Sequence, residues 1–394
     1  MAKRVAILGS TGSIGKSALR VIESLNSSSE LQDTKYEIIA LSAHNNVRLL
    51  AEQAKRYKPR FIAVTNADCL GQLRSAVEGM GVEILAGADS LTKIAQLEDV
   101  DIVLTAVVGA AGLAPALAAA RKGKTLAIAN KEPLVVAGEL LTKTAKENGS
   151  VILPVDSEHS AIFQAMQSGR KEEVNRIILT SSGGPFRKIT AQQIRNVTLE
   201  DALAHPVWNM GPKITVDSAT MMNKALEIIE ARWLFDVPVD KIEVLIHPES
   251  IVHSLVEFVD GSVMAQMSLP DMCLPIQYAL TYPRRLAGIT KRLHLDELGK
   301  LTFEKPNLKI FRALALGFEV ARTGGTSAVV FNAANETAVQ EFLAGKIKFA
   351  NIIELIEHCL DKHSVKTDVS LEELFEADLW ARKEVVECLN QKVL

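Results

Sequence analysis

Residues Val5–Gly15 read VAILGSTGSIG, a short apolar run followed at once by a glycine-rich turn. The run Val5–Leu8 has the composition of a buried β-strand, and Lys16–Leu25 then repeats apolar residues at helical spacing. The glycines follow the spacing G-x-x-G-x-x-G, a relative of the dinucleotide fingerprint, in the strand–turn–helix context that the fingerprint requires. Backbone amides beside glycines can approach a pyrophosphate, and the helix N-terminus adds a favourable dipole. The stretch predicts a nucleotide site on a parallel α/β fold; a glycine-rich turn without a ligand is the alternative.

The pattern continues through residues 1–150, where short strands alternate with helices. Such alternation is typical of a doubly wound, Rossmann-like parallel sheet, and together with the glycine turn it predicts a nucleotide-binding region. The further strands are predicted at Tyr36–Leu41, Phe61–Val64, Ile102–Val107 and Thr125–Ala129, and the helices include one from about Val47 and another at Leu113–Arg121.

The pattern changes after Val151. Strands separated by long loops and helices predict a central α+β domain over 151–290, and Asp260-Gly261 between two of them indicates a hairpin. A linker over 291–306 then leads to a C-terminal helical bundle over 307–394, since helical periodicity replaces strand signals. The strands are predicted at Val151–Leu153, Arg176–Leu179, Ile242–Ile246, Ile251–Val259 and Ser262–Met267, and the bundle helices at Leu308–Ala321, Ser327–Leu343, Ile352–Leu360 and Leu371–Leu389.

Composition narrows the class of protein. A chain of 394 residues is long for a single core, and a net charge of −3 gives no general attraction to nucleic acid or acidic membranes. No apolar stretch is long enough to cross a membrane, and the glycine turn follows the N-terminal apolar run too soon for a signal peptide. The spacing of Cys69, Cys273, Cys359 and Cys388 matches no zinc site, so reduced cysteines in the cytoplasm are expected. A plastid-type organelle is the alternative if a transit peptide was removed.

The end of the second predicted strand bears on the choice of cofactor. NAD-preferring sites place an acid there for the ribose hydroxyls, but this chain has Leu41–Asn46, LSAHNN, without one. Arg48 follows on the next helix. Loss of the carboxylate and gain of donors favour the 2′-phosphate of NADP, although a plain loop and a solvated Arg48 are the alternative.

Three acids form a candidate metal site. Asp156 and Glu158 are two residues apart just after a predicted strand, and Glu227 from a later helix can complete the set. Hard oxygen ligands suit Mg²⁺ or Mn²⁺. Taken alone, Asp-Ser-Glu opening a helix is more often a capping pattern, and His159 is more often a cap or surface group than a further ligand.

The segment His205–Glu230, HPVWNMGPKITVDSATMMNKALEIIE, combines a loop carrying Trp with a polar helix. The helix is predicted from about Ser218, as its cap, to Phe235. Asn223 and Lys224 precede Glu227 by four and three residues, so the three side chains share one face. A loop with Trp beside such a face suggests a lid over a charged substrate.

Further polar groups follow other strands. Ser181–Phe186, SSGGPF, offers hydroxyls and glycine amides for an anion, although an ordinary Gly-Pro turn is equally compatible. His247 and His253 are expected to be structural rather than catalytic. Met272 opens a helix and could pack on a nicotinamide ring, although a core role is more common for methionine.

These motifs together resemble a known family. GSTGSIG, ANKE at 129–132, PVDSEHSAIFQ, SSGGPFR, HPVWNMG, ITVDSATMMNKALEIIEARWLF and HPESIVHS occur in order over essentially the whole chain, as in the 1-deoxy-D-xylulose 5-phosphate reductoisomerases. The resemblance implies an NADPH-binding domain over 1–150, a catalytic and dimerisation domain over 151–290 with a flexible flap near 204–213, and a helical bundle over 307–394. It also implies a homodimer and one Mg²⁺ or Mn²⁺ per active site. The implied reaction rearranges and reduces a sugar phosphate in non-mevalonate isoprenoid biosynthesis.

The resemblance also implies residue roles. The metal ligands would be Asp156, Glu158 and Glu227, and the catalytic candidates Lys131, Glu132 and Glu158. The substrate contacts would be Ser157, Ser182, His205, Trp208, Ser218, Asn223 and Lys224, with Met210 also on the flap. The cofactor contacts would be Gly9, Ser10, Thr11, Gly12, Ser13, Ile14, Ala43, Asn45, Asn46, Asn130, Glu132, Gly211 and Met272. Family members often carry a glycine-containing turn where this chain has Ala43–Asn46, which leaves the individual 2′-phosphate contacts open.

Two other classes of function remain open at this point. A metal-dependent NADP dehydrogenase acting on a β-hydroxy acid would share GSTGSIG but would not need the Ser/Asn/Lys donors for a phosphate. A nucleotide-sensing protein would need neither the acids nor the Trp loop.

Overall fold

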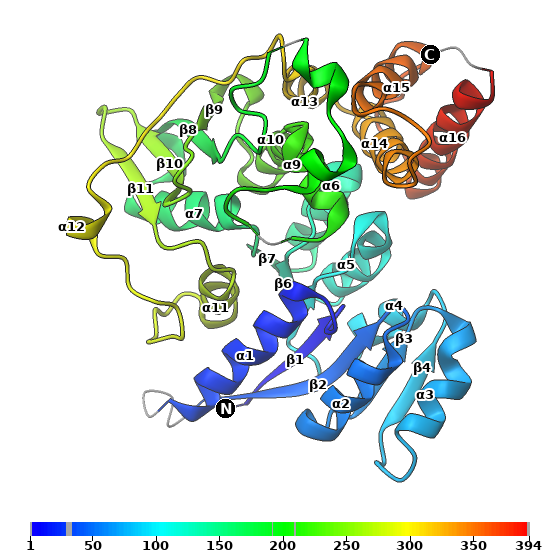
Figure 1. Ribbon diagram of the computed structural model, residues 1–394. Coiled ribbons are helices and arrows are strands. Elements are labelled where there is room, and N and C mark those ends of the chain that lie inside the picture. The colour runs from blue at the N-terminus through cyan, green and yellow to red at the C-terminus, as the bar shows by residue number, and fades with distance from the viewer. Residues whose placement is uncertain (1, 29–33, 191, 209, 392–394) are drawn as a thin grey trace. The chain divides into compact units, whose positions relative to one another are not determined.

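The computed structural model describes residues 2–28, 34–190, 192–208 and 210–391 (Figure 1). The chain divides into two compact units that do not follow the predicted regions 1–150 and 151–290. The first unit comprises Met1–Pro133, Glu139–Ser160 and Asp271–Lys291, and the second Leu134–Gly138, Ala161–Pro270 and Arg292–Leu394.

The first unit is built on a parallel sheet of seven strands in the order β4-β3-β2-β1-β5-β6-β7. The strand order reverses at β1, so the loop after β1 lies at the switch point where such sheets bind ligands. The predicted Rossmann-like sheet is confirmed. The strands are β1 Ala2–Leu8, β2 Lys35–Ala43, β3 Phe61–Val64, β4 Glu83–Ala86, β5 Ile102–Thr105, β6 Thr125–Ile128 and β7 Val151–Pro154.

Two edge strands differ from the sequence analysis. The strand β4 was not predicted, because its short sequence EILA is only half-buried and lacks a β-branched run. The strand β7 was assigned to the second region, but it pairs with β6 through Ile128 and Pro154. The loop that follows β7, with Asp156, therefore belongs to the nucleotide-type sheet.

Helices connect the strands of the first unit, and two of them continue past its boundaries. The helix α6 (Glu132–Glu147) has non-helical backbone angles at Ala137, within the Leu134–Gly138 segment assigned to the second unit. The helix α7 (Ser157–Ala165) begins directly after the Asp156 loop. The remaining helices are α1 Ser13–Ser27, α2 Val47–Tyr57, α3 Leu70–Ala76, α4 Ser90–Ala95, α5 Leu113–Arg121 and α11 Cys273–Thr281.

The second unit contains a mixed sheet in the order β11-β10-β8-β9. Its strands are β8 Val174–Ser181, β9 Ile242–Ile246, β10 Val252–Phe258 and β11 Val263–Met267. The predicted Asp260-Gly261 hairpin is confirmed, because β10 and β11 pair antiparallel around it. The central α+β prediction therefore holds for this sheet.

The helices of the second unit confirm the predicted C-terminal bundle and correct one other prediction. Ser218 does not cap a helix that runs to Phe235; it lies inside α9, and α10 starts later. The cause is Met221, whose φ of 63° places it in the left-handed region and breaks the helix. The helices are α8 Leu199–Leu203, α9 Pro212–Ala219, α10 Met222–Phe235, α12 Leu295–Leu298, α13 Arg312–Thr323, α14 Ser327–Leu343, α15 Phe349–Lys362 and α16 Leu371–Asn390.

The predicted linker is anchored to the sheet of the second unit. Glu304 forms a bridge with Ile246, and the buried His247 ring lies 2.8 Å from the Thr302 carbonyl oxygen through Nδ1. The other ring nitrogen of His247 accepts from the amides of Ile251 and Val252, each at 3.1 Å. His247 therefore has the structural role expected of it.

All four cysteines are unpaired; Cys273, Cys359 and Cys388 are buried, and burial raises the pKa of Cys359 to about 12. Among the helices of the described ranges, none combines the length and apolar character needed to cross a membrane.

Candidate functional site

The glycine turn after β1 exposes the N-terminus of α1. Gly9 has a φ of 89°, and a Cβ there would collide with the carbonyl group of Ala106, so glycine is required. Its amide donates to Ser42 Oγ at 2.9 Å. Gly12 and Ser13 are exposed at the start of α1. Backbone amides at this end can therefore reach an anionic group such as a pyrophosphate.

Ser10 holds the turn in place with its side chain. It is fully buried, and its Oγ donates to Gln53 Oε1 at 2.7 Å, while Gln53 Nε2 donates back to the Ser10 carbonyl oxygen at 2.9 Å. Any contact of Ser10 with a cofactor would therefore use the backbone. The role of Gln53 was not predicted. The one sequence feature that could indicate it is that Gln53 is a polar residue on the apolar face of α2.

The end of β2 presents polar side chains and no acid. His44, Asn45, Asn46 and Arg48 are exposed there, and His44 Nδ1 lies 2.7 Å from Thr65 Oγ1. Asn46 caps α2 by accepting from the Leu49 amide at 3.2 Å. The structure thus keeps the donor-rich edge that the sequence indicated for a 2′-phosphate.

Asn130, after β6, carries an unsatisfied buried acceptor. Its Oδ1 is buried and has no hydrogen-bond partner among the described residues, while its Nδ2 donates to the Gly109 carbonyl oxygen at 3.4 Å. A Cβ at Gly112 would collide with this amide. Orphaned buried acceptors call for an explanation, and a bound group that donates to Oδ1 would supply one.

Asp156 forms a buried ion pair at the ends of neighbouring strands. Lys131 follows β6 and Asp156 follows β7, and Lys131 Nζ lies 2.6 Å from Asp156 Oδ2. His159 Nδ1 is 3.6 Å from the other carboxylate oxygen. Burial alone would raise the pKa of Asp156, but Lys131 and His159 outweigh it and hold that pKa well below its usual range. Asp156 is therefore ionised at neutral pH.

The neighbours of Asp156 add further oxygen atoms. The Glu158 amide donates to Asp156 Oδ1 at 3.3 Å, the capping pattern that was the alternative to a metal. Ser157 Oγ donates to Glu158 Oε2 at 2.5 Å, and both side chains are half-buried. Capping and metal ligation are compatible here, because Asp156 Oδ2 and the Glu158 carboxylate do not take part in the cap.

Glu227 forms a second buried acid–lysine pair, within α10. Its side chain is fully buried; Asn223 Nδ2 donates to Oε1 at 2.6 Å, and Lys224 Nζ pairs with Oε2. The helical spacing predicted this group, and the structure confirms it. A buried carboxylate held by two donors keeps its oxygens at fixed positions.

The loop after β8 meets the residues of the predicted flap. Ser182 Oγ lies 3.1 Å from His205 Nε2, and the Gly184 amide donates to Ser182 Oγ at 3.2 Å. Gly184 has a φ of 62°, and a Cβ there would collide with the carbonyl group of Ser218. Ser182, His205 and Ser218 therefore lie in one neighbourhood of the second unit.

His205 orders the start of the flap. Its Nδ1 accepts from the amides of Val207 at 3.2 Å and Trp208 at 2.9 Å, so the neutral ring carries its proton on Nε2 and donates to Ser182. Burial lowers the pKa of His205, which favours this neutral form. Trp208 and Met210 are half-buried, and Asn209 lies outside the described residues.

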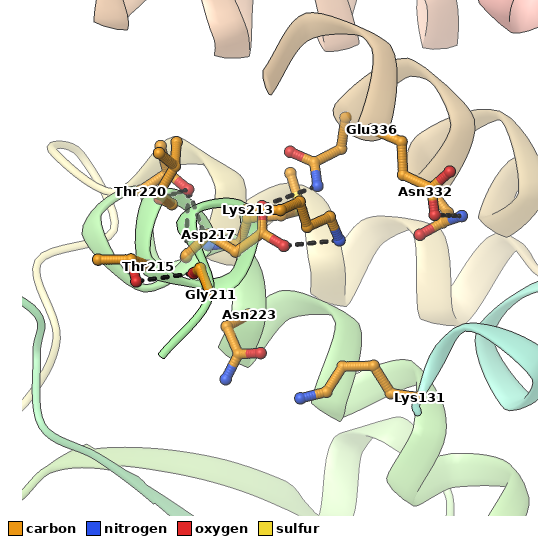
Figure 2. Close-up of polar contacts among 12 residues, drawn as sticks. Lys131, Gly211, Lys213, Thr215, Asp217, Thr220, Asn223, Asn332 and Glu336 are labelled. Carbon is orange, nitrogen blue, oxygen red and sulfur yellow. Dashed lines mark hydrogen bonds and ion pairs between the residues drawn. The ribbon is translucent and has the colours of Figure 1, made fainter. Parts of the chain in front are cut away.

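The flap leads into α9, the helix that carries Ser218. Gly211 precedes the helix, and Thr215 Oγ1 donates to its carbonyl oxygen at 2.9 Å (Figure 2). Glu132, at the start of α6, is buried in the first unit, and Met272, which precedes α11, is half-buried. The predicted residues thus form two sets, one in each compact unit.

The donor sets fit a hard divalent cation and a phosphate. Asp156 and Glu227 supply carboxylate oxygens in buried surroundings, where each already faces the positive charge of a lysine. Ser182, Ser218, Asn223 and Lys224 supply the hydroxyl, amide and ammonium donors that a phosphate accepts.

Family models match three parts of the chain. Residues 5–138 match 1-deoxy-D-xylulose 5-phosphate reductoisomerase, residues 152–235 match the reductoisomerase C-terminal domain, and residues 267–384 match the DXP reductoisomerase C-terminal domain. Together the matches include residues of both compact units.

Curated and solved relatives match over the full length. The 1-deoxy-D-xylulose 5-phosphate reductoisomerases of Chloroherpeton thalassium and Halothermothrix orenii are 49% and 48% identical to this chain; the matches cover 97% and 99% of the chain and 97% and 100% of the relatives. A solved reductoisomerase from Zymomonas mobilis in complex with NADPH is 42% identical, with a TM-score of 0.91 and 99% of each chain covered. Another, in complex with NADPH, fosmidomycin and magnesium, is 41% identical, with a TM-score of 0.92 and 98% of each chain covered.

These full-length similarities agree with the Rossmann-like sheet described above. The chain belongs to the 1-deoxy-D-xylulose 5-phosphate reductoisomerase family.

Proposed function

We propose that this protein converts 1-deoxy-D-xylulose 5-phosphate into 2-C-methyl-D-erythritol 4-phosphate, using NADPH and a divalent metal, in non-mevalonate isoprenoid biosynthesis. The observation that carries the proposal is the pair of buried carboxylates, Asp156 and Glu227, each facing a lysine. Relatives of the same length bear the name of this activity, and solved relatives bind NADPH and magnesium.

The residues divide among three tasks in this proposal. Asp156, Glu158 and Glu227 hold the metal, and the amides at Gly9–Ile14, the edge at Ala43–Asn46, Asn130, Glu132, Gly211 and Met272 receive the cofactor. Ser157, Ser182, His205, Trp208, Ser218, Asn223 and Lys224 bind the substrate. The bound cation supplies Lewis-acid stabilisation of the oxyanion that develops on the substrate.

Side chains of the second unit are suited to binding the phosphate of the substrate. The neutral His205 ring presents an Nε2 proton beside Ser182 Oγ, and a phosphate oxygen can accept from both groups. Asn223 and Lys224 are held by Glu227, so their donors are already oriented before the substrate arrives. Binding energy from this remote phosphate then orients the reacting end of the molecule.

Lys131 and Glu132 serve the chemical step from the first unit. The Lys131 ammonium lies against Asp156, where it can hold a substrate hydroxyl in register with the carboxylate. Glu132 and Glu158 are the candidates for proton transfer. Trp208 covers the reacting atoms and excludes water, which strengthens the electrostatic contacts inside.

The assembly and location follow the same proposal. We infer a homodimer in the cytoplasm. The strand β11 is the edge of its sheet and exposes Val263 and Met264, an apolar surface of the kind that a second copy covers. Sedimentation at micromolar concentration should give twice the mass of the chain; a monomer contradicts this part of the proposal.

One assay tests the catalytic proposal. NADPH absorbance is followed after addition of 1-deoxy-D-xylulose 5-phosphate, with Mg²⁺, with Mn²⁺ and with a chelator. We expect oxidation of NADPH only when a metal is present, with 2-C-methyl-D-erythritol 4-phosphate as the product. NADH should support turnover poorly, because the edge at Ala43–Arg48 lacks an acid. Absence of NADPH oxidation with either metal would exclude the proposed reaction, and oxidation of a β-hydroxy acid would favour a dehydrogenase.

A further inference from the structure

A buried carboxylate joins the flap-bearing helix to the C-terminal bundle within the second unit. Asp217 in α9 is 1% exposed, and its Oδ1 accepts from Asn335 Nδ2 of α14 at 3.0 Å. Its Oδ2 pairs with Lys213 Nζ, one turn earlier in α9, at 2.7 Å (Figure 2). The contact with Asn335 spans 118 residues of sequence, so it fixes one element to another.

The position of Asp217 connects it to the proposed phosphate contacts. Ser218 is the next residue, and the flap ends at the N-terminus of the same helix. Because a Cβ at Gly184 would collide with the Ser218 carbonyl group, this point of α9 is also packed against the Ser182 loop. A shift of α9 would therefore move Ser218 relative to Ser182.

Contacts within α9 do little to stabilise this helix. It runs only from Pro212 to Ala219, no side chain of the described residues caps its N-terminus, and Met221 separates it from α10. Thr220 adds local contacts, since its Oγ1 donates to the carbonyl oxygens of Val216 and Asp217. A helix of this length is marginal alone, so its position depends on tertiary contacts.

The contact between Asp217 and Asn335 is better suited to fixing the position of α9 than to stabilising the fold. Burying a carboxylate costs free energy that an apolar pair of similar volume avoids. Asn335 adds to that cost, because its buried Oδ1 has no hydrogen-bond partner within the part of the chain that the structure describes. A directional bond to a charged acceptor, however, allows one register of α9 on α14, which apolar packing does not enforce.

We propose that Asp217 and Asn335 are positioning residues for the sugar phosphate: through them, the C-terminal bundle fixes Ser218 and the C-terminal end of the flap. This inference rests on the proposed function for the role of Ser218. Neither residue touches the substrate. Their loss should therefore weaken substrate binding while leaving NADPH binding unchanged.

Asn332 provides a matched control on the same helix. Both asparagines are fully buried in α14, but Asn332 Nδ2 donates to Glu336 Oε1 of its own helix at 3.2 Å (Figure 2). The test compares Asn335→Ala with Asn332→Ala in the full chain. We measure KM for 1-deoxy-D-xylulose 5-phosphate, KM for NADPH, kcat, Tm, and amide hydrogen exchange over residues 213–221.

Asn335→Ala should raise KM for the sugar phosphate by about tenfold and speed exchange over 213–221, because α9 loses its register. KM for NADPH should stay at the wild-type value. Asn332→Ala should lower Tm but leave exchange over 213–221 and KM for the sugar phosphate unchanged. The reciprocal double variant Asp217→Asn/Asn335→Asp restores a donor and an acceptor and should recover most of both losses. If Asn335→Ala folds poorly, Asp217→Asn, which keeps an acceptor but loses the ion pair with Lys213, should shift KM in the same direction by a smaller factor.

Two results would overturn the inference. Unchanged exchange over 213–221 in Asn335→Ala would show that Asn335 does not hold α9. Faster exchange with an unchanged KM for the sugar phosphate would show that α9 does not position the substrate. Failure of the proposed function is distinct from both, because the wild-type protein would then show no NADPH oxidation with the sugar phosphate.

Discussion

The two buried acid–lysine pairs have the same chemistry but arise in different ways. Glu227 and Lys224 are three residues apart in α10, so the helix alone brings them together. Asp156 and Lys131 come from the ends of the neighbouring strands β7 and β6, so the order of the sheet brings them together. Local helical periodicity therefore forms the Glu227–Lys224 pair, and sheet topology forms the Asp156–Lys131 pair. A change that disturbs one of these features should break only the pair that depends on it.

Glu227→Gln is expected to have the largest effect, because it removes a proposed metal ligand and leaves Lys224 buried without its carboxylate. We expect kcat/KM at saturating Mn²⁺ to fall by about a thousandfold or more, since Lewis-acid stabilisation contributes several kcal/mol. NADPH binding, measured by cofactor fluorescence, should be nearly intact. Glu319→Gln, an exposed acid paired with Arg312, serves as the control. Full activity of Glu227→Gln would remove it from the set of ligands.

Asp156→Asn tests the pair that sheet topology forms, through its effect on the stability of the protein. It removes the carboxylate that is paired with the buried Lys131 ammonium, and we expect the free energy of unfolding to fall by about 3–5 kcal/mol. The double variant Lys131→Met/Asp156→Asn removes both charges and should recover much of that stability, measured by urea unfolding, without recovering turnover. Recovery of turnover in the double variant would show that the pair is structural only.

The smallest effect is expected from the pH dependence of His205. Burial lowers the pKa of His205, so folding favours the neutral ring. Its contribution to flap stability is complete above the ordinary value of 6.5 and is lost as pH falls through the lower folded pKa, because protonated Nδ1 cannot accept from Val207 and Trp208.

Exchange of these two amides, corrected for intrinsic rates, measures this effect. Protection should fall several-fold as pH is lowered from 7 to about 5, which corresponds to roughly 1 kcal/mol. His205→Gln should lack the pH step. Equal pH profiles for the two proteins would show that the ring does not order the flap.

The sequence predicted those parts of the fold that depend on neighbours along the chain. The apolar runs at Phe61–Val64 and Ile242–Ile246, and the helical period at Leu113–Arg121 and Ser327–Leu343, gave strands and helices with the observed bounds. The break at Met221 was not predicted, because no glycine, proline or asparagine marks a left-handed residue there.

The site shows the same division. The group of Asn223, Lys224 and Glu227 followed from helical spacing, and the structure confirms it. The contact of Asp217 with Asn335 depends on the packing of α9 against α14, and the sequence pattern of neither segment predicts it. The candidate metal role of Asp156 and the anion role of the turn that carries Ser182 followed from the residues themselves, whereas the role of His205 came from the family resemblance. The contacts among their neighbours came from the fold.

Gly184 has a consequence for how this protein tolerates sequence change. Its φ of 62° and the approach of the Ser218 carbonyl group exclude any side chain at position 184. A position with no reactive group is thus as restricted as the acids that hold the metal in the proposed site. Selection would remove variants at Gly184 as well as variants at Glu227. An invariant residue at this site therefore does not by itself identify a chemical role.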